Sequence, residues 1–168
     1  GRGVESDATW QALDVPYRMS GKTSVNSEVT IDPGANFAFK LNASLVFEGG
    51  STVKAVGTAA DPITFTGTDT IPGWWQGILL NNTNDPNNIM EHVIIEYGGG
   101  SAFDGSTQPA NLTVGRIYNP SRLTLKNSTL RYSEGYGLFV HSNSTINADV
   151  CTVNTIEDNQ DGQCRIDP

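Results

Sequence analysis

Short runs of alternating apolar and polar residues recur along the chain, and they constrain its fold more than any other feature. Each run spans only a few residues and has the two-residue period of a β-strand with one buried face. The clearest are "FAFKL" (37–41), "ITFT" (63–66), "HVIIEY" (92–97), "RLTLK" (122–126) and "GLFV" (137–140). Segments rich in Gly, Pro, Asn and Asp separate the runs and are typical of turns. Because no window has helical spacing of apolar residues over three turns, the sequence predicts an all-β chain.

The shortness of the predicted strands distinguishes between all-β architectures. A sandwich, a barrel or a solenoid can be built from many strands. Sandwich strands usually span five or six residues and are joined by hairpin turns such as Asn-Gly, and this sequence contains no Asn-Gly. Very short strands fit a solenoid better, in which each coil of roughly 20 to 30 residues adds one strand to each of several stacked sheets.

Internal similarity supports the solenoid. The segment 88–100 aligns with 125–137 at an offset of 35 residues, so that Ile95 falls on Leu130 and Tyr97 on Tyr132. The offset corresponds to one coil plus the insertion "GGGSAFDGSTQPA". Stacked coils are expected to show such repeats, and the segments 93–97 and 128–132 are therefore predicted to be parallel neighbours.

The order "VTIDPGANFAFKLNASLVFEGG", "GWWQGILL", "EHVIIEYGGG" and "LTLKNSTLRYSEGYGLFV" resembles the right-handed parallel β-helix repeat proteins of bacterial cell surfaces. The resemblance covers residues 28–147 and implies a single-stranded right-handed parallel β-helix of about four to five coils. Residues 1–27 and 148–168 are then expected to cover its two ends, because uncovered strand edges promote aggregation. The resemblance does not specify a function, since this group includes lyases, hydrolases, epimerases and adhesive stalks.

Length and charge limit the possible partners. The chain has 168 residues, which suits one domain with its own core. Its formal net charge of −8 argues against a nucleic-acid partner, which requires a basic face. No apolar run approaches the roughly 18 residues of a transmembrane segment. The acidity fits a secreted or cell-surface protein.

Two cysteines, Cys151 and Cys164, flank the polar segment "TVNTIEDNQDGQ". This arrangement is typical of a disulfide, which would contribute on the order of 3 kcal/mol by closing the loop. Two unconnected thiols are the alternative. If the disulfide forms, the protein is expected to be secreted or displayed on a bacterial cell surface.

Adjacent tryptophans occur in "GWWQGI". In the resembled family the tryptophan before Gly-Ile packs inward at a corner of the coil, and Trp75 matches that position. Adjacent strand residues point to opposite faces, so we expect Trp74 to lie outside, unless the loop 81–88 or the N-terminal segment covers it. An exposed indole is a common platform for a sugar ring. The ligand-binding candidates are Trp74, Tyr97, Tyr132 and Tyr136.

The full sets of catalytic motifs of polysaccharide-cleaving β-helix enzymes do not occur. The resembled lyases would carry "WIDH", and the resembled polygalacturonases would carry Asn-x-Asp, Asp-Asp, Gly-His-Gly and Arg-x-Lys. Of these, only Asn-x-Asp occurs, at Asn147–Asp149 and at Asn159–Asp161, and the other motifs are absent. The remaining candidates for acid–base chemistry are Glu91, His92, Glu96, Arg131 and Glu134, around a groove near His92 and Arg131. The alternative is that Glu96 and Arg131 form a surface ion pair.

A weak calcium motif occurs near the C-terminus. Glu157, Asn159 and Asp161 alternate before Gly162 as at the start of an EF-hand loop. The twelfth position is Pro168 instead of the bidentate Glu, which favours a polar turn inside the disulfide loop. Calcium is therefore possible as a ligand, and no other cofactor is expected.

These observations predict a non-catalytic extracellular or cell-surface module that binds carbohydrate, on a polysaccharide or a cell-surface glycan, or that serves in adhesion. The alternative is a polysaccharide-processing enzyme, similar to a lyase or a glycoside hydrolase. The two classes differ in one respect that a structure reveals. An enzyme should bring at least two carboxylates and a cation within hydrogen-bond reach.

Overall fold

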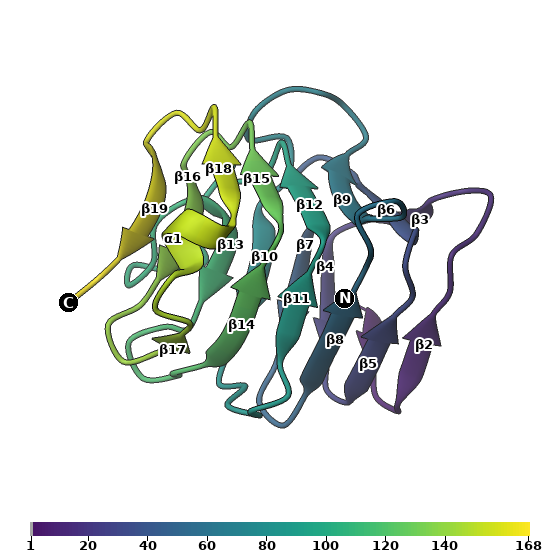
Figure 1. Cartoon of the computed structure of the whole chain (residues 1–168), viewed down its shortest axis with the longest axis horizontal. Coiled ribbons are helices and arrows are strands. Elements are labelled where there is room, and N and C mark those ends of the chain that lie inside the picture. Colours follow the sequence, from purple (N-terminus) through teal and green to yellow (C-terminus); the bar gives the residue numbers. More distant parts are fainter. Residues whose placement is uncertain (1) are drawn as a thin grey trace.

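The computed structural model describes residues 2–168, which form a parallel β-helix with three stacked sheets (Figure 1). Sheet A contains β1 (Arg2–Val4), β4 (Lys22–Val25), β7 (Ser44–Phe47), β10 (Gly77–Leu80), β13 (Ala110–Val114), β16 (Tyr136–Val140) and β19 (Gly162–Ile166). Sheet B contains β2 (Ala8–Trp10), β5 (Glu28–Ile31), β8 (Thr52–Val56), β11 (Ile89–Glu91), β14 (Arg122–Lys126) and β17 (Thr145–Ile146). Sheet C contains β3 (Tyr17–Met19), β6 (Asn36–Phe39), β9 (Ile63–Gly67), β12 (Val93–Glu96), β15 (Thr129–Arg131) and β18 (Thr155–Glu157).

Each coil visits sheets A, B and C in turn, and each strand pairs in parallel with the equivalent strand of the next coil. The predicted neighbours β12 and β15 are paired, with Ile95 opposite Leu130 and Glu96 opposite Arg131. The parallel β-helix is therefore confirmed, and so is the offset of 35 residues between these coils.

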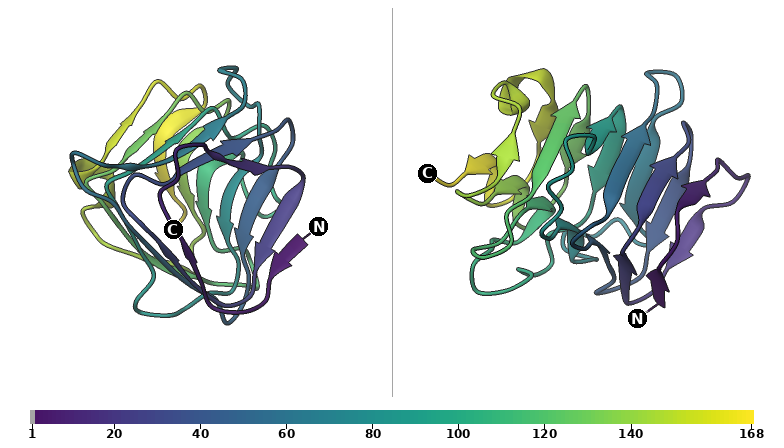
Figure 2. Two further views of the ribbon diagram at one scale, coloured as in Figure 1. Left: turned by 90° about the vertical axis from the view of Figure 1, so that its right-hand side faces the viewer. Right: turned by 90° about the horizontal axis from the view of Figure 1, so that it is seen from below.

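The stack is longer than the four or five coils expected. Residues 2–27 contribute β1 to β4, and residues 148–168 contribute β18 and β19, so the segments expected to cover the ends also continue the sheets. Figure 2 shows the N-terminal coil (purple) and the C-terminal coil (yellow) at opposite ends of the stack.

The C-terminal end is closed by a short helix and a covalent link. Helix α1 (Val150–Val153) places Val150 in the core, where its side chain is fully buried. The next residue, Cys151, forms a disulfide with Cys164 of β19. The predicted disulfide is confirmed, and it ties α1 to the last strand of sheet A.

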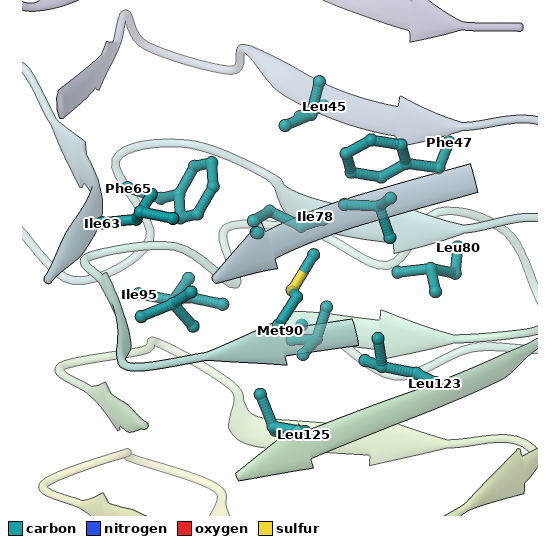
Figure 3. Packing of buried hydrophobic residues seen from close by; sticks show 14 of the residues in the cluster. Leu45, Phe47, Ile63, Phe65, Ile78, Leu80, Met90, Ile95, Leu123 and Leu125 are labelled. Atoms are coloured by element: carbon teal, nitrogen blue, oxygen red, sulfur yellow. The ribbon is translucent and has the colours of Figure 1, made fainter. Parts of the chain in front are cut away.

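The core is a column of side chains that point into the coils from all three sheets (Figure 3). Aromatic rings stack within it: Phe37 lies on Phe65 of the next coil with a centroid distance of 4.9 Å. Phe39 lies on Trp75 with a distance of 4.0 Å and an angle of 8° between the ring planes. Burial of each such side chain stabilises the fold by roughly 1.5–3 kcal/mol, so the stacked coils hold one another in register.

The side chains of buried asparagines form hydrogen bonds with backbone groups near the ends of strands. The side-chain oxygen Oδ1 of Asn111 accepts a hydrogen bond from the backbone amide of Gly98 at 2.8 Å. The side-chain nitrogen Nδ2 of Asn111 donates to the backbone carbonyl of Arg131 at 2.9 Å. Asn88 similarly accepts from the Val53 amide at 2.9 Å. These asparagines satisfy backbone groups that strand pairing leaves free, which explains part of the Asn content of the sequence.

Candidate functional site

Two tyrosines stack where the chain turns from sheet C to sheet A. Tyr97 follows β12 and Tyr132 follows β15, and both have left-handed φ angles, of 62° and 55°. Their ring centroids are 5.2 Å apart and the ring planes differ by 20°. Both side chains are half-buried. We refer to Trp74, Tyr97 and Tyr132, with Glu96 and Arg131, as the aromatic corner.

The two adjacent tryptophans occupy different environments. Trp75 is fully buried, stacks on Phe39, and donates a hydrogen bond from Nε1 to the Glu96 carbonyl at 2.9 Å. Its predicted place in the core is confirmed. Trp74 is half-buried rather than outside, because it also packs against the core cluster.

Trp74 is fixed by its neighbours one coil before Tyr97. Its Nε1 donates to Thr68 Oγ1 at 3.0 Å. Its ring lies on Gly67, where an added Cβ would come within 3.0 Å of Trp74 Cδ1. In sheet C, Gly67 pairs with Phe39 of the preceding coil. The Trp74 ring therefore occupies space that a side chain at Gly67 would need.

An ion pair lies beside the tyrosine rings. Arg131 Nε is 2.9 Å from Glu96 Oε2, and Thr66 Oγ1 donates to Glu96 Oε1 at 3.0 Å. The Arg131 guanidinium is also 5.1 Å from the centroid of the Tyr132 ring. The hydrogen bond to Glu96 raises the pKa of Arg131. Burial, followed by the Glu96 charge, raises the pKa of Tyr97, so the Tyr97 hydroxyl remains a hydrogen-bond donor at neutral pH.

The catalytic candidates are divided between two places. Glu96 and Arg131 lie in the aromatic corner, and the Glu134 side chain lies beside it, against Gly73. His92 precedes β12 and has a left-handed φ of 49°. Because His92 and Arg131 lie at opposite ends of sheet C, roughly 13 Å of strand separates them, so their side chains are not within hydrogen-bond reach of one another.

The candidates near His92 pair with other residues. Glu91 lies 3.3 Å from Lys126 Nζ and accepts a hydrogen bond from Asn127 at 3.1 Å. A shallow pocket of about 180 Å³ is lined by His92 and Asn127, among others. Within the described residues 2–168, each Lys or Arg found in an ion pair contacts a single carboxylate.

The remaining candidates have structural contacts of their own. Tyr136, in β16, lies apart from the stacked tyrosines and accepts a hydrogen bond from Arg165 Nη1 at 3.4 Å. Of the calcium candidates, Asn159 is buried, and its side-chain oxygen Oδ1 accepts a hydrogen bond from the backbone amide of Ser133 at 3.0 Å. Glu157 and Asp161 are exposed. No group of three or more His, Cys, Asp or Glu side chains in the described part of the chain is arranged to hold a metal ion.

The outer face of sheet A is a feature that the sequence reasoning missed. Val46, Leu79 and Phe139 lie outside the core cluster, yet they are only 2%, 2% and 0% exposed. Residues 98–109, the part of the insertion that precedes β13, fold back toward this face, where the Ala102 carbonyl accepts a hydrogen bond from the Gln76 side chain at 3.1 Å. Uninterrupted apolar runs such as "GILL" are a signal for strands buried on both faces.

A pocket of about 210 Å³ remains open beside the insertion. Val46, Leu79 and Phe103 provide its apolar lining, and polar side chains of sheet A and its corners provide the rest. We refer to it as the sheet A pocket. None of the five residues of the aromatic corner lines it, so it is a separate site.

Comparison of the chain with protein-family models, with curated proteins and with solved structures finds no match in any of the three. Strand pairing establishes the parallel β-helix. The relation to bacterial cell-surface proteins rests only on the resemblance in sequence. Within residues 2–168, no helix has the length and apolar character needed to span a membrane.

Proposed function

We propose that this protein is a non-catalytic extracellular module, displayed on or secreted from a bacterial cell, that binds polysaccharide or cell-surface glycan through the aromatic corner. The observation that carries the proposal is the stacked pair of Tyr97 and Tyr132, with half-buried Trp74 one coil earlier. Three amphipathic aromatic side chains along one corner of a rigid solenoid form a surface suited to sugar rings.

Aromatic side chains of this kind combine apolar area with a polar group at the edge. The stacked rings of Tyr97 and Tyr132 and the hydrogen bond from Trp74 to Thr68 fix the side chains before a ligand arrives. Little conformational entropy is then lost when a sugar binds. The tyrosine hydroxyl groups supply the hydrogen bonding that a purely apolar patch lacks.

Charged groups beside the rings offer further hydrogen bonds. Arg131 has five N–H donors, and it uses Nε to contact Glu96. Its other donors remain available to sugar hydroxyls next to the rings. Because the pair carries no net charge, the corner suits neutral sugars as well as charged ones.

The extracellular location in this proposal is supported by the disulfide between Cys151 and Cys164. Disulfides persist in oxidising compartments and are rare in most cytosols. The stacked, covalently closed coils also suit an adhesive or structural unit, since each coil is braced by its neighbours.

A glycan array tests the proposal. Wild-type protein is expected to bind a restricted set of glycans, and the variants Trp74→Ala and Tyr132→Ala should lose about tenfold or more in affinity for them. Tyr118→Ala is the matched control, because Tyr118 is 86% exposed and lies after β13, at the other end of sheet A. A parallel array with a chelator tests whether calcium contributes. Equal losses in all three variants, or no bound glycan, would contradict the proposal.

A further inference from the structure

The sheet A pocket combines an apolar floor with a polar rim. Val46 and Leu79 form the floor on the outer face of β7 and β10, and the Phe103 side chain reaches it from the insertion 98–109. Asn42 lies at the rim, where the chain enters sheet A. An engineered cavity of about 150 Å³ accommodates benzene, so a pocket of about 210 Å³ has room for one substituted six-membered ring.

The charged residues that line the pocket are both cations, in a chain of net charge −8. They are Lys22 of β4 and Arg116, which follows β13. Each is held by a carboxylate that does not line the pocket: Lys22 Nζ lies 2.7 Å from Glu48 Oε1, and Arg116 Nε pairs with Asp104. The carboxylates therefore orient the cations, and although each pair is neutral overall, the side chains that line the pocket present N–H donors.

Both cations keep hydrogen-bond donors free. An ammonium group has three donors and a guanidinium has five. In the part of the chain that the structure describes, Lys22 uses one donor, toward Glu48, and Arg116 uses its Nε, toward Asp104. The terminal nitrogens of Arg116 form a planar fork that matches a carboxylate.

We propose that the sheet A pocket binds a small organic carboxylate built on a single ring, such as an acidic sugar. The carboxylate lies between Lys22 and Arg116, and one face of the ring lies on Val46, Leu79 and Phe103. Asn42 bonds a ring hydroxyl. This site uses none of the residues of the aromatic corner, so either site can fail a test while the other passes.

Titration of ¹⁵N-labelled full-length protein with three probes tests the site by NMR. D-glucuronate carries a ring, hydroxyls and a carboxylate; benzoate carries a ring and a carboxylate; D-glucose lacks the charge. Glucuronate is expected to produce saturable amide shifts at residues 42–46, 76–81 and 101–104, with at least about tenfold weaker binding of glucose, because a charged hydrogen bond is lost.

The variant Lys22→Gln should weaken glucuronate binding about tenfold. Lys22 is 55% exposed, so its loss should leave the spectrum of the free protein well dispersed. Lys54→Gln is the matched control, because Lys54 forms the same kind of pair, with Glu28 at 2.8 Å on sheet B, and does not line the pocket.

The outcomes distinguish an acidic sugar from other ring carboxylates. Binding of glucuronate without benzoate identifies an acidic sugar, and binding of benzoate identifies a carboxylate that need not belong to a sugar. The proposal is overturned if neither carboxylate produces a saturable shift up to about 10 mM, if glucose binds as tightly as glucuronate, or if Lys22→Gln and Lys54→Gln behave alike.

Discussion

The Tyr132 ring lies on the Tyr97 ring of the preceding coil, with 5.2 Å between their centroids. The stacking follows from the backbone, because Glu96 and Arg131 are paired in register and the next residue in each coil has a left-handed φ. Each turn thereby presents its aromatic ring at the same corner. The aromatic corner is thus a product of coil repetition, and its rigidity depends on the stability of the stacked coils.

The two tryptophans should differ in their contribution to that stability. Trp75→Ala is expected to lower the free energy of unfolding by about 3–5 kcal/mol, because it empties a fully buried site beside Phe39. Trp74→Ala should cost about 1 kcal/mol, since Trp74 is half-buried and loses one hydrogen bond to Thr68. Urea denaturation measures both. A larger loss for Trp74→Ala would contradict the assignment of the two faces.

The disulfide should stabilise the C-terminal end. Replacing Cys151 and Cys164 together by Ser is expected to lower the free energy of unfolding by about 3 kcal/mol. Hydrogen exchange should accelerate most in α1 and β19, which the disulfide joins. Thiol titration of the unfolded, unreduced wild-type protein should find no reactive thiol. Two reactive thiols would remove the covalent closure and the support for an extracellular location.

Asn111 should be among the most sensitive polar residues. Asn111→Ala removes the side-chain partners of the Gly98 amide and the Arg131 carbonyl in a fully buried site. Buried unpaired backbone groups cost about 1–3 kcal/mol each, so we expect a loss of about 3 kcal/mol in thermal or urea unfolding. The control Asn36→Ala removes one exposed hydrogen bond and should change stability by less than about 0.5 kcal/mol.

Glu48 should make stability depend on acidic pH. Burial alone would raise its pKa, but hydrogen bonds from Lys22 and Asn81 outweigh burial and hold the pKa below its ordinary value. A depressed folded pKa stabilises the fold above the unfolded value of about 4.3, and this contribution disappears as the pH falls through the folded value. The difference in unfolding free energy between wild type and Glu48→Gln should therefore be largest above about pH 5 and shrink in acid. A constant difference would contradict the role of Glu48.

Pattern and repetition were sufficient to predict the stacked sheets. A two-residue period defines which face of β12 is buried, and the offset of 35 residues predicts its pairing with β15. The first coil was not recognisable, because β2 and β3 are short and their residues are half-buried or exposed, which weakens the alternation that reveals a strand.

The features of the two sites that the sequence did not predict depend on contacts between loops and strands. Burial of Leu79 on the outer face of sheet A depends on where the insertion 98–109 folds, and only the unbroken run "GILL" indicated a covered face. Trp74 is half-buried because Gly67 leaves room for its ring, a fit that the alternation of strand residues does not encode. The separation of His92 from Arg131, by contrast, follows from strand geometry alone.

The most direct measurement follows the indole N–H signals of the three tryptophans by NMR while a glycan selected from the array is added. The Trp74 indole, whose Nε1 bonds Thr68 at the aromatic corner, should shift and saturate. The Trp10 indole, in β2 of the first coil, is the internal reference and should stay nearly unchanged. Trp→Phe variants assign the signals. A bound glycan that leaves the Trp74 signal in place would contradict carbohydrate binding at the aromatic corner.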